Sequence, residues 1–175
     1  LNMLEKSTSP DPKIYQQVAF LYALQLYGDG NFKEALPYLQ KTKNSKAQSQ
    51  VQARATYWSG ETHYQLHEYP EAQRDFSAFL ALKETTLAEY PNALYGLGYA
   101  LFNQKKYVEA AEYFSKYIQT QPEASRLADA NLRLGDSYFA AGKYWPAMEA
   151  YDKVITANVS NTDYAAFQKA ISYGI

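Results

Sequence analysis

The sequence predicts an all-α protein, a solenoid of antiparallel helix pairs with about four full repeats and partial repeats at its ends. Three observations lead to this fold class. Apolar residues recur three and four positions apart, which is the period of an amphipathic helix. An aromatic residue, an alanine three positions later and a large apolar residue four positions beyond it form a pattern that occurs four times. A small residue stands twelve positions before each of these alanines.

The stretch 91–122, PNALYGLGYALFNQKKYVEAAEYFSKYIQTQP, illustrates one repeat. Two helical patterns flank the polar run 103–106, which predicts a tight turn. The small residues Gly98 and Ala110 predict a close approach of the two helices, because larger side chains would push the helix axes apart. The predicted apolar faces are Leu94, Leu97 and Leu101 in the first helix and Tyr107, Ala110, Phe114 and Tyr117 in the second.

The four copies of the pattern keep a nearly constant spacing. Their anchoring alanines are 37, 38 and 37 residues apart, and self-similarity at such a period is typical of a solenoid. The copies are Phe32–Ala35–Leu39, Tyr69–Ala72–Phe76, Tyr107–Ala110–Phe114 and Tyr144–Ala147–Tyr151, preceded by Ala23, Gly60, Gly98 and Gly135.

These residues resemble the tetratricopeptide repeat (TPR) family over nearly the whole chain. The resemblance implies a right-handed superhelical TPR solenoid whose first helices line a concave groove. The period here exceeds the roughly 34 residues usual for the family, and Ala23 and Pro37 depart from its pattern. The stretches in the third and fourth copies resemble the longer-period TPRs of bacterial cell-envelope proteins, such as the Tol–Pal-associated TPR protein and the outer-membrane assembly lipoproteins. That likeness favours the periplasm or cell envelope over the cytoplasm.

The predicted domain organisation follows the repeat register. Because residues 158–175 contain a first helix without a second, we expect the chain to be a piece of a longer array; a natural capping helix is the alternative. We assign residues 1–11 to the end of a preceding repeat or a linker, 12–44, 48–84, 91–122 and 125–157 to four repeats, and 158–175 to a truncated fifth repeat or a cap.

Composition narrows the classes of partner. The formal net charge is −1, so no bulk electrostatic attraction draws the chain to nucleic acid. No apolar run approaches the roughly 18 residues that span a bilayer, so we expect no direct membrane insertion. The sequence has no cysteine, which excludes disulfides, thiol catalysis and cysteine-ligated zinc.

The sequence carries no recognisable catalytic or cofactor motif. It lacks a phosphate-binding loop and a nucleophile elbow, so we predict neither an enzyme nor a bound cofactor. His63 and His67 have the i, i+4 spacing of metal ligands, but the order His-Glu-x-x-His is absent. We therefore interpret both histidines as structural and predict no metal site.

The remaining candidate is a binding surface for a protein or peptide. Residues three before, one after and four after each small anchor share a helix face and should line the groove. Aromatic residues there offer a large contact area at low entropic cost. The row four after the anchor consists of Tyr27, Tyr64, Phe102 and Phe139. A second interpretation of this row is that its rings pack between repeats. The predicted partner-binding residues are Arg54, Tyr57, Asn92, Tyr95, Tyr99, Phe102, Asn103 and Phe139.

Two functions fit these features. The first is a non-catalytic scaffold or adaptor that holds a partner peptide or helix in the concave groove. The alternative is a structural spacer or self-association module within a larger multi-repeat envelope protein, with homo-oligomers forming through the exposed ends of the array.

Overall fold

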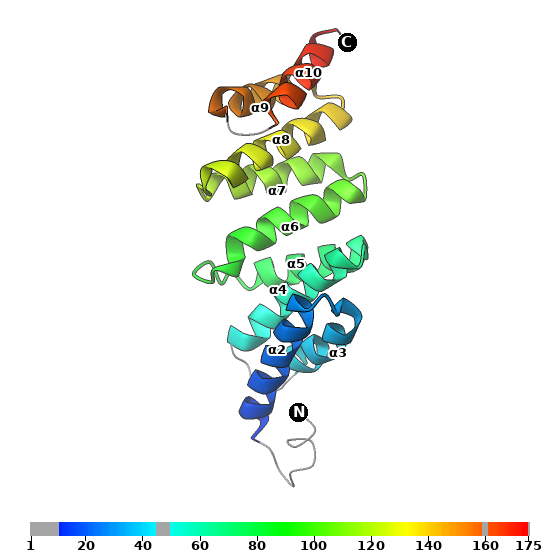
Figure 1. Ribbon diagram of the computed structural model, residues 1–175, viewed down its shortest axis with the longest axis vertical. Helices are drawn as coiled ribbons and strands as arrows, with labels where there is room; N and C mark the ends of the chain where they lie inside the picture. The colour runs from blue at the N-terminus through cyan, green and yellow to red at the C-terminus, as the bar shows by residue number, and fades with distance from the viewer. Residues whose placement is uncertain (1–10, 45–49, 159–160, 175) are drawn as a thin grey trace. The chain divides into compact units, whose positions relative to one another are not determined.

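The computed structural model describes residues 11–44, 50–158 and 161–174, and the described residues form nine helices joined by turns (Figure 1). The predicted all-α class is confirmed. Most of the predicted segment 1–11 lies outside the described residues. The helices are α2 (Pro12–Gly28), α3 (Phe32–Lys43), α4 (Gln50–Gln65), α5 (Tyr69–Ala81), α6 (Glu89–Asn103), α7 (Tyr107–Gln119), α8 (Ala124–Ala140), α9 (Tyr144–Ala157) and α10 (Thr162–Tyr173).

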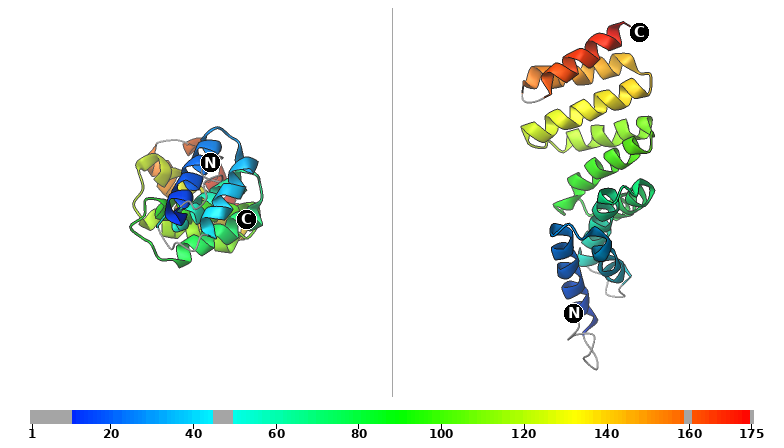
Figure 2. Two further views of the ribbon diagram at one scale, coloured as in Figure 1. Left: turned by 90° about the horizontal axis from the view of Figure 1, so that it is seen from below. Right: turned by 45° about the vertical axis from the view of Figure 1, so that its right-hand side comes forward.

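The chain divides into two compact units, residues 1–93 and residues 94–175, with the boundary inside α6. In the first unit each helix packs on the next, from α2 through α5. In the second unit α7, α8, α9 and α10 also pack in chain order, and Figure 2 shows these four helices stacked one after another.

Four helices end in the same type of turn. Each turn contains one residue with a positive φ: Gly30 at 78°, His67 at 61°, Lys105 at 61° and Gly142 at 72°. The next amide donates back to a carbonyl five residues earlier, as when Lys106 N–H donates to Leu101 O over 3.0 Å. This bond satisfies one of the carbonyls left unpaired at a helix C-terminus. The turns therefore close the helix pairs α2–α3, α4–α5, α6–α7 and α8–α9.

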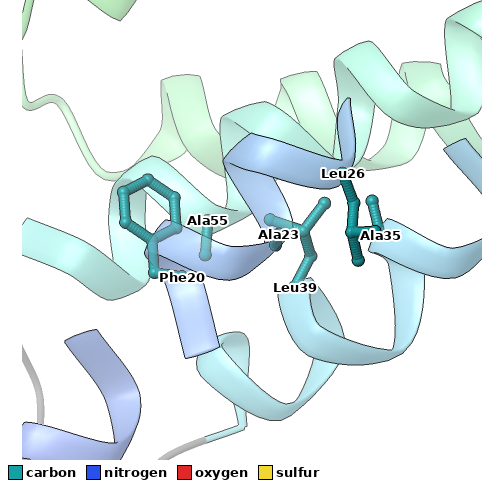
Figure 3. Close-up of a cluster of buried hydrophobic side chains, with 6 residues drawn as sticks. All are labelled: Phe20, Ala23, Leu26, Ala35, Leu39 and Ala55. Carbon is teal, nitrogen blue, oxygen red and sulfur yellow. The ribbon is translucent and has the colours of Figure 1, made fainter. Parts of the chain in front are cut away.

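The small anchors allow close contact inside the helix pairs. Gly60, Gly98 and Gly135 lie directly against the rings of Phe76, Phe114 and Tyr151. The equivalent Ala23 belongs to a buried cluster with Leu39, to which α2, α3 and α4 contribute (Figure 3). The close approach inferred from residue size is thus present.

Two helix starts lie earlier than the predicted repeats. The helix α6 begins at Glu89 rather than at Pro91, which leaves the proline in the first turn, where its missing N–H is not needed. The helix α8 begins at Ala124, one residue before the predicted start. Pro37 lies inside α3 with an exposed side chain.

Candidate partner-binding site

Two tyrosines and an aspartate form the centre of the candidate site in the second unit. Tyr95 and Tyr99 lie one turn apart on α6, and both hydroxyls donate to Oδ2 of Asp129 on α8, that of Tyr99 over 2.7 Å. The two rings meet edge to face, with centroids 4.9 Å apart. The ring of Tyr95 also packs against that of Tyr117, at 4.6 Å between centroids. Both predicted tyrosines are therefore anchored by their rings and by their hydroxyls.

Arg133 extends this centre along α8. Its Nε donates to the hydroxyl oxygen of Tyr99 over 3.1 Å and lies 3.7 Å from Oδ1 of Asp129. Its Nη1 donates to Oδ2 of Asp136 over 3.0 Å. The guanidinium carbon lies 5.8 Å from the centroid of the Tyr99 ring. Arg133 thus joins the two carboxylates, since it lies about one helical turn from each of them on α8.

The inner end of the network is Asp136, whose side chain is 9% exposed. Its Oδ1 accepts hydrogen bonds from Tyr151 of α9 over 3.0 Å and from Tyr164 of α10 over 3.2 Å. Hydrogen bonds therefore link α6, α8, α9 and α10 through two tyrosine pairs, two aspartates and one arginine. We call Tyr95, Tyr99, Asp129, Arg133, Asp136, Tyr151 and Tyr164 the tyrosine–aspartate network.

Burial and neighbouring charges set the protonation states of the network. Burial raises the pKa of Tyr99 to about 12, and the bond to Asp129 acts in the same direction. Burial and the Asp129 bond also raise the pKa of Tyr95. Burial raises the pKa of Asp136 against the opposing effect of the Tyr151 hydrogen bond. Near neutral pH the tyrosines are therefore neutral donors.

The outer edge of the network reaches solvent. The side chain of Arg133 is 32% exposed and that of Asp129 is 27% exposed, whereas Asp136 is buried. A guanidinium carries five N–H donors and a carboxylate accepts several hydrogen bonds. Held next to each other at the surface, Arg133 can donate hydrogen bonds to the carbonyl groups of a bound peptide, and Asp129 can accept them from its amide groups.

The predicted residues of the first unit form a separate set. Arg54 Nε lies 2.6 Å from Oε1 of the buried Glu89, and its guanidinium carbon lies 5.3 Å from the centroid of the Phe20 ring. Tyr57 is 5% exposed, and its hydroxyl donates to Glu61 over 2.9 Å. Its ring packs against Phe76 and Phe79. Tyr57 is thus part of the core of this unit, and Arg54 is the more accessible of the two.

Each ring of the aromatic row four after the anchors packs within its own helix pair, and Tyr27 also meets Trp58 of the next pair, with ring centroids 5.1 Å apart. Each ring meets, edge to face, the aromatic residue that begins the following helix. The centroid separations are 5.2 Å for Tyr27–Phe32, 5.6 Å for Tyr64–Tyr69, 5.3 Å for Phe102–Tyr107 and 5.5 Å for Phe139–Tyr144. Phe102 and Phe139 remain half-buried.

The two predicted asparagines lie at different depths. Asn103 is exposed at the end of α6, and its side-chain amide donates to the carbonyl of Tyr99 over 2.9 Å. Asn92 is half-buried on the same helix and belongs to the first unit. The structure therefore brings Tyr95, Tyr99 and Asn103 together, and it places Phe139 in the turn region of the α8–α9 pair.

Sequence reasoning missed Arg133 as a member of the site, and it left Asp136, which stands one residue after the small anchor Gly135, out of the predicted partner-binding residues. A signal was available, because Asp129, Arg133 and Asp136 follow one another at i, i+4 and i+7, which places opposite charges on one helix face. It also missed a second polar cluster. Lys43 Nζ donates to the buried Oδ1 of Asp75 over 2.7 Å.

His63 joins that second cluster from α4. Its Nδ1 lies 2.6 Å from Glu68 Oε2, and its Nε2 lies 3.7 Å from Asp75 Oδ2. His67 occupies the turn and pairs with the Tyr69 hydroxyl over 2.9 Å. Among the described residues, no three histidine, cysteine or acidic side chains group as metal ligands. Nor does any described helix have the length and apolar character needed to cross a membrane.

Comparison with known families gives two matches, both to models described as tetratricopeptide repeat. One matches residues 57–125 and the other residues 129–158, together more than half of the chain. A curated relative is the outer membrane protein assembly factor BamD of Rickettsia prowazekii (strain Madrid E), 35% identical over 82 residues. The match covers 46% of this chain and spans only 33% of the relative.

Solved structures are similar in fold. A crystal structure of the MamA protein superposes with a TM-score of 0.74 at 21% identity, covering 91% of this chain and 81% of the other. A putative kinesin light chain of Podosopora anserina with nearly identical TPR-like repeats gives a TM-score of 0.70 at 14% identity, covering 95% and 88%. At these identities the likeness concerns the fold alone.

Proposed function

Since the chain belongs to the tetratricopeptide repeat family, we propose that it is a non-catalytic scaffold that binds a peptide segment of a protein partner. The observation that carries the proposal is the partly exposed edge of the tyrosine–aspartate network in the second unit. There Asp129 and Arg133 lie side by side, 27% and 32% exposed, and the hydroxyl of Tyr99 bonds to both.

The chemistry of this edge suits a polypeptide backbone. Arg133 can donate to a carbonyl or carboxylate of the partner, and Asp129 can accept from an amide N–H or a basic side chain. The rings of Tyr95 and Tyr99 supply apolar contact beside these polar groups. Because hydrogen bonds already hold the four side chains, binding costs little ordering entropy.

The proposal is tested by comparing a double variant, Tyr95→Phe/Tyr99→Phe, with the unchanged protein. Both rings remain, so the packing against Tyr117 is retained, but the hydroxyls that hold Asp129 are lost. Proteins captured from a lysate of the source organism are identified by mass spectrometry, and affinity for the purified partner segment is then measured by calorimetry. We expect about a tenfold loss of affinity for each hydroxyl that the bound state needs.

A matched control makes the same chemical change elsewhere. Tyr22 and Tyr173 are 39% and 66% exposed, and neither belongs to the network. The variant Tyr22→Phe/Tyr173→Phe should bind like the unchanged protein. Equal retention of every partner by both double variants would contradict the proposed site, provided that circular dichroism shows equal helicity.

A second candidate function is end-to-end self-association. Apolar side chains are exposed on the first and last described helices: Leu21 of α2 is 64% exposed, and Phe167 of α10 is 63% exposed. Exposed apolar faces at the ends of a repeat array favour stacking of another repeat. Light scattering over a concentration series tests this function. A monomer at every concentration, with no change in Leu21→Glu/Phe167→Glu, would exclude it.

We further propose that the protein acts in the bacterial cell envelope rather than in the cytoplasm. Its support is the 82-residue match to an outer membrane protein assembly factor. Fractionation of cells that express the natural full-length protein tests the assignment. Recovery with cytoplasmic markers alone would overturn it.

A further inference from the structure

The repeat register continues into α10, where Ala170 takes the place of the small anchor. The helices α4 and α8 each pack on the second helix of the preceding pair, as α10 packs on α9. Both carry small, buried residues five positions before and two positions after their anchor: Ala55 and Thr62 in α4, Ala130 and Ser137 in α8. The matching residues of α10 are Ala165 and Ser172, which are 0% and 5% exposed. Ala165 belongs to one buried cluster with Tyr151 and Val154 of α9.

A hydrogen bond supports this register. Tyr99 stands one residue after its anchor, and its hydroxyl donates to Asp129, six residues before the next anchor. Tyr164 stands six residues before Ala170, and its hydroxyl donates to Asp136, which again directly follows an anchor. The donor and the acceptor are exchanged, but the two positions are the same. Ala170 therefore stands at the anchor position of α10.

In this register α10 exposes the face that the other first helices turn toward their own second helix. The anchor shares this face with the residues four before, three before and three after it. We call Ala166, Phe167, Ala170 and Tyr173 the α10 face. Ala166 and Ala170 are exposed, Phe167 is 63% exposed and Tyr173 is 66% exposed. The residues that correspond to the two alanines are buried in the other described first helices: Ala19 and Ala23, Thr56 and Gly60, Leu94 and Gly98, Asn131 and Gly135.

The helix α2 shows the reverse burial, which separates the two faces of a first helix. Ala19 and Ala23, on the side of its own second helix, are fully buried. Val18 and Gln25, five before and two after the anchor, are half-buried and exposed. The exposed side of α2 and the α10 face are therefore different halves of the repeat interface, and each fits a different kind of helix.

The helix pairs show what kind of helix covers such a face. Each covering helix begins with an aromatic residue, has a buried alanine three positions later and a large apolar residue seven positions later. The last of these lies on the anchor, as the ring of Phe76 lies against Gly60. The position of Phe167 takes part as well, because the corresponding Tyr57 packs its ring against Phe76 and Phe79.

Ile171 distinguishes phenylalanine from tyrosine at the position over the anchor. In α8 the residue after the anchor is Asp136, and it accepts the hydroxyl of Tyr151 over 3.0 Å. Ile171 takes that place in α10, is half-buried and has no polar side-chain atom. A tyrosine hydroxyl buried there would lose its hydrogen bonds to water without gaining a partner, so a phenylalanine fits better.

We propose that the α10 face binds an amphipathic helix of a protein partner, which carries an aromatic residue, an alanine three positions later and a phenylalanine seven positions later. A second copy of this chain is a poor donor of such a helix. In its described second helices the residue over the anchor is already buried, with at most 1% exposure from Leu39 to Tyr151. The inference rests on burial along α10, so it does not depend on the peptide site at Asp129 and Arg133.

The probe is a synthetic, end-capped peptide with the sequence of residues 106–120, KYVEAAEYFSKYIQT, which contains the three required residues. A second peptide has tyrosine in place of the phenylalanine that corresponds to Phe114. Proton–nitrogen NMR spectra of the whole chain follow the backbone amides of Ala170 and Tyr173 during each titration. We expect both amides to shift with the first peptide, and the second to bind about tenfold more weakly because its hydroxyl is buried without a partner.

Two variants of the chain test the contact. Ala170→Glu places a carboxylate where the phenylalanine ring would lie and should abolish binding. Ala124→Glu is the matched control, because it makes the same change at another exposed alanine, in α8, and should bind like the unchanged protein. Ile171→Asp copies Asp136 and should reverse the preference, so that the tyrosine peptide binds more tightly than the phenylalanine peptide. Circular dichroism verifies that all variants are folded.

The proposal also requires that the natural full-length protein bind the peptide. If it does not, while residues 1–175 do, a segment of its own chain covers α10 and the proposal is wrong. Equal affinity of the two peptides, or unchanged binding in folded Ala170→Glu, would equally overturn it. So would a dimer in sedimentation experiments that Ala170→Glu abolishes, because the α10 face would then belong to a second copy of the chain.

Discussion

The ring of Tyr151 occupies the space that a side chain at Gly135 would need. A Cβ at Gly135 would lie 2.5 Å from Cε1 and 2.7 Å from Cδ1 of this ring. Tyr151 is fully buried, and its hydroxyl donates to Asp136 over 3.0 Å, so the ring cannot retreat without losing that bond. The glycine therefore couples the packing of α8 on α9 to the tyrosine–aspartate network.

Replacing this glycine should destabilise the protein. We expect Gly135→Ala to lower the free energy of unfolding by about 1–3 kcal/mol, because an added methyl in a packed core displaces its neighbours. Chemical denaturation measures the change. Gly28→Ala is the matched control, since Gly28 is also helical and a Cβ there meets nothing within 4 Å. Equal stability of Gly135→Ala and the unchanged protein would contradict the contact.

Alkaline pH should destabilise the fold through the buried tyrosines. The pKa of Tyr99 is raised from its ordinary value of 10.0 to about 12. At a pH below the ordinary tyrosine pKa, Tyr99 is neutral in both the folded and the unfolded state, and its contribution to folding stability is fully present. Above it the unfolded chain ionises first, so stability falls as pH rises toward 12. When unfolding is measured between about pH 9 and 12, the unfolding free energy of Tyr99→Phe should fall less steeply with pH than that of the unchanged protein. A slope identical to that of the unchanged protein would contradict the shift.

Removing only one partner of the ion pair between Lys43 and Asp75 should lower the free energy of unfolding substantially. Asp75 is 5% exposed, so Lys43→Met leaves a buried carboxylate and should cost about 3 kcal/mol. The double variant Lys43→Met/Asp75→Leu should recover most of that loss, because no buried charge remains. Lys116→Met provides a control at an exposed pair with Glu112, where we expect less than about 1 kcal/mol. Additive effects at Lys43 and Asp75 would contradict the coupling.

Tyr57 should contribute more to the stability of the fold than to partner binding. Its ring packs against Phe76 and Phe79, and we expect Tyr57→Ala to cost about 3–5 kcal/mol of unfolding free energy. Trp145→Ala is a control at an aromatic residue that is 68% exposed and should change little. Thermal melts compare the two, and an equally small effect of both variants would show that the Tyr57 ring is not part of the core. Tyr57→Phe keeps the ring and is the variant to use in a partner-binding assay.

Much of the helix pairing could be predicted because its contacts are close in sequence. The anchors Gly60, Gly98 and Gly135 each stand sixteen residues before the ring that covers them, within one helix pair. The aromatic row was harder to interpret. Periodicity alone does not distinguish a packing role from a binding role for a half-buried ring such as Phe102. Only its contact with Tyr107 in the structure places it against the turn.

The sequence by itself determined the helical class, the helix pairs and the small anchors between them. Those features depend on helical period, turn chemistry and residue size, all of which are local. Only the tertiary structure decided which polar groups meet. Arg133 reaches the hydroxyl of Tyr99 across 34 positions, and Asp136 receives Tyr164 across 28. Such partners come from different helix pairs, and their meeting depends on how the pairs stack and on side-chain rotamers, which no repeat pattern encodes.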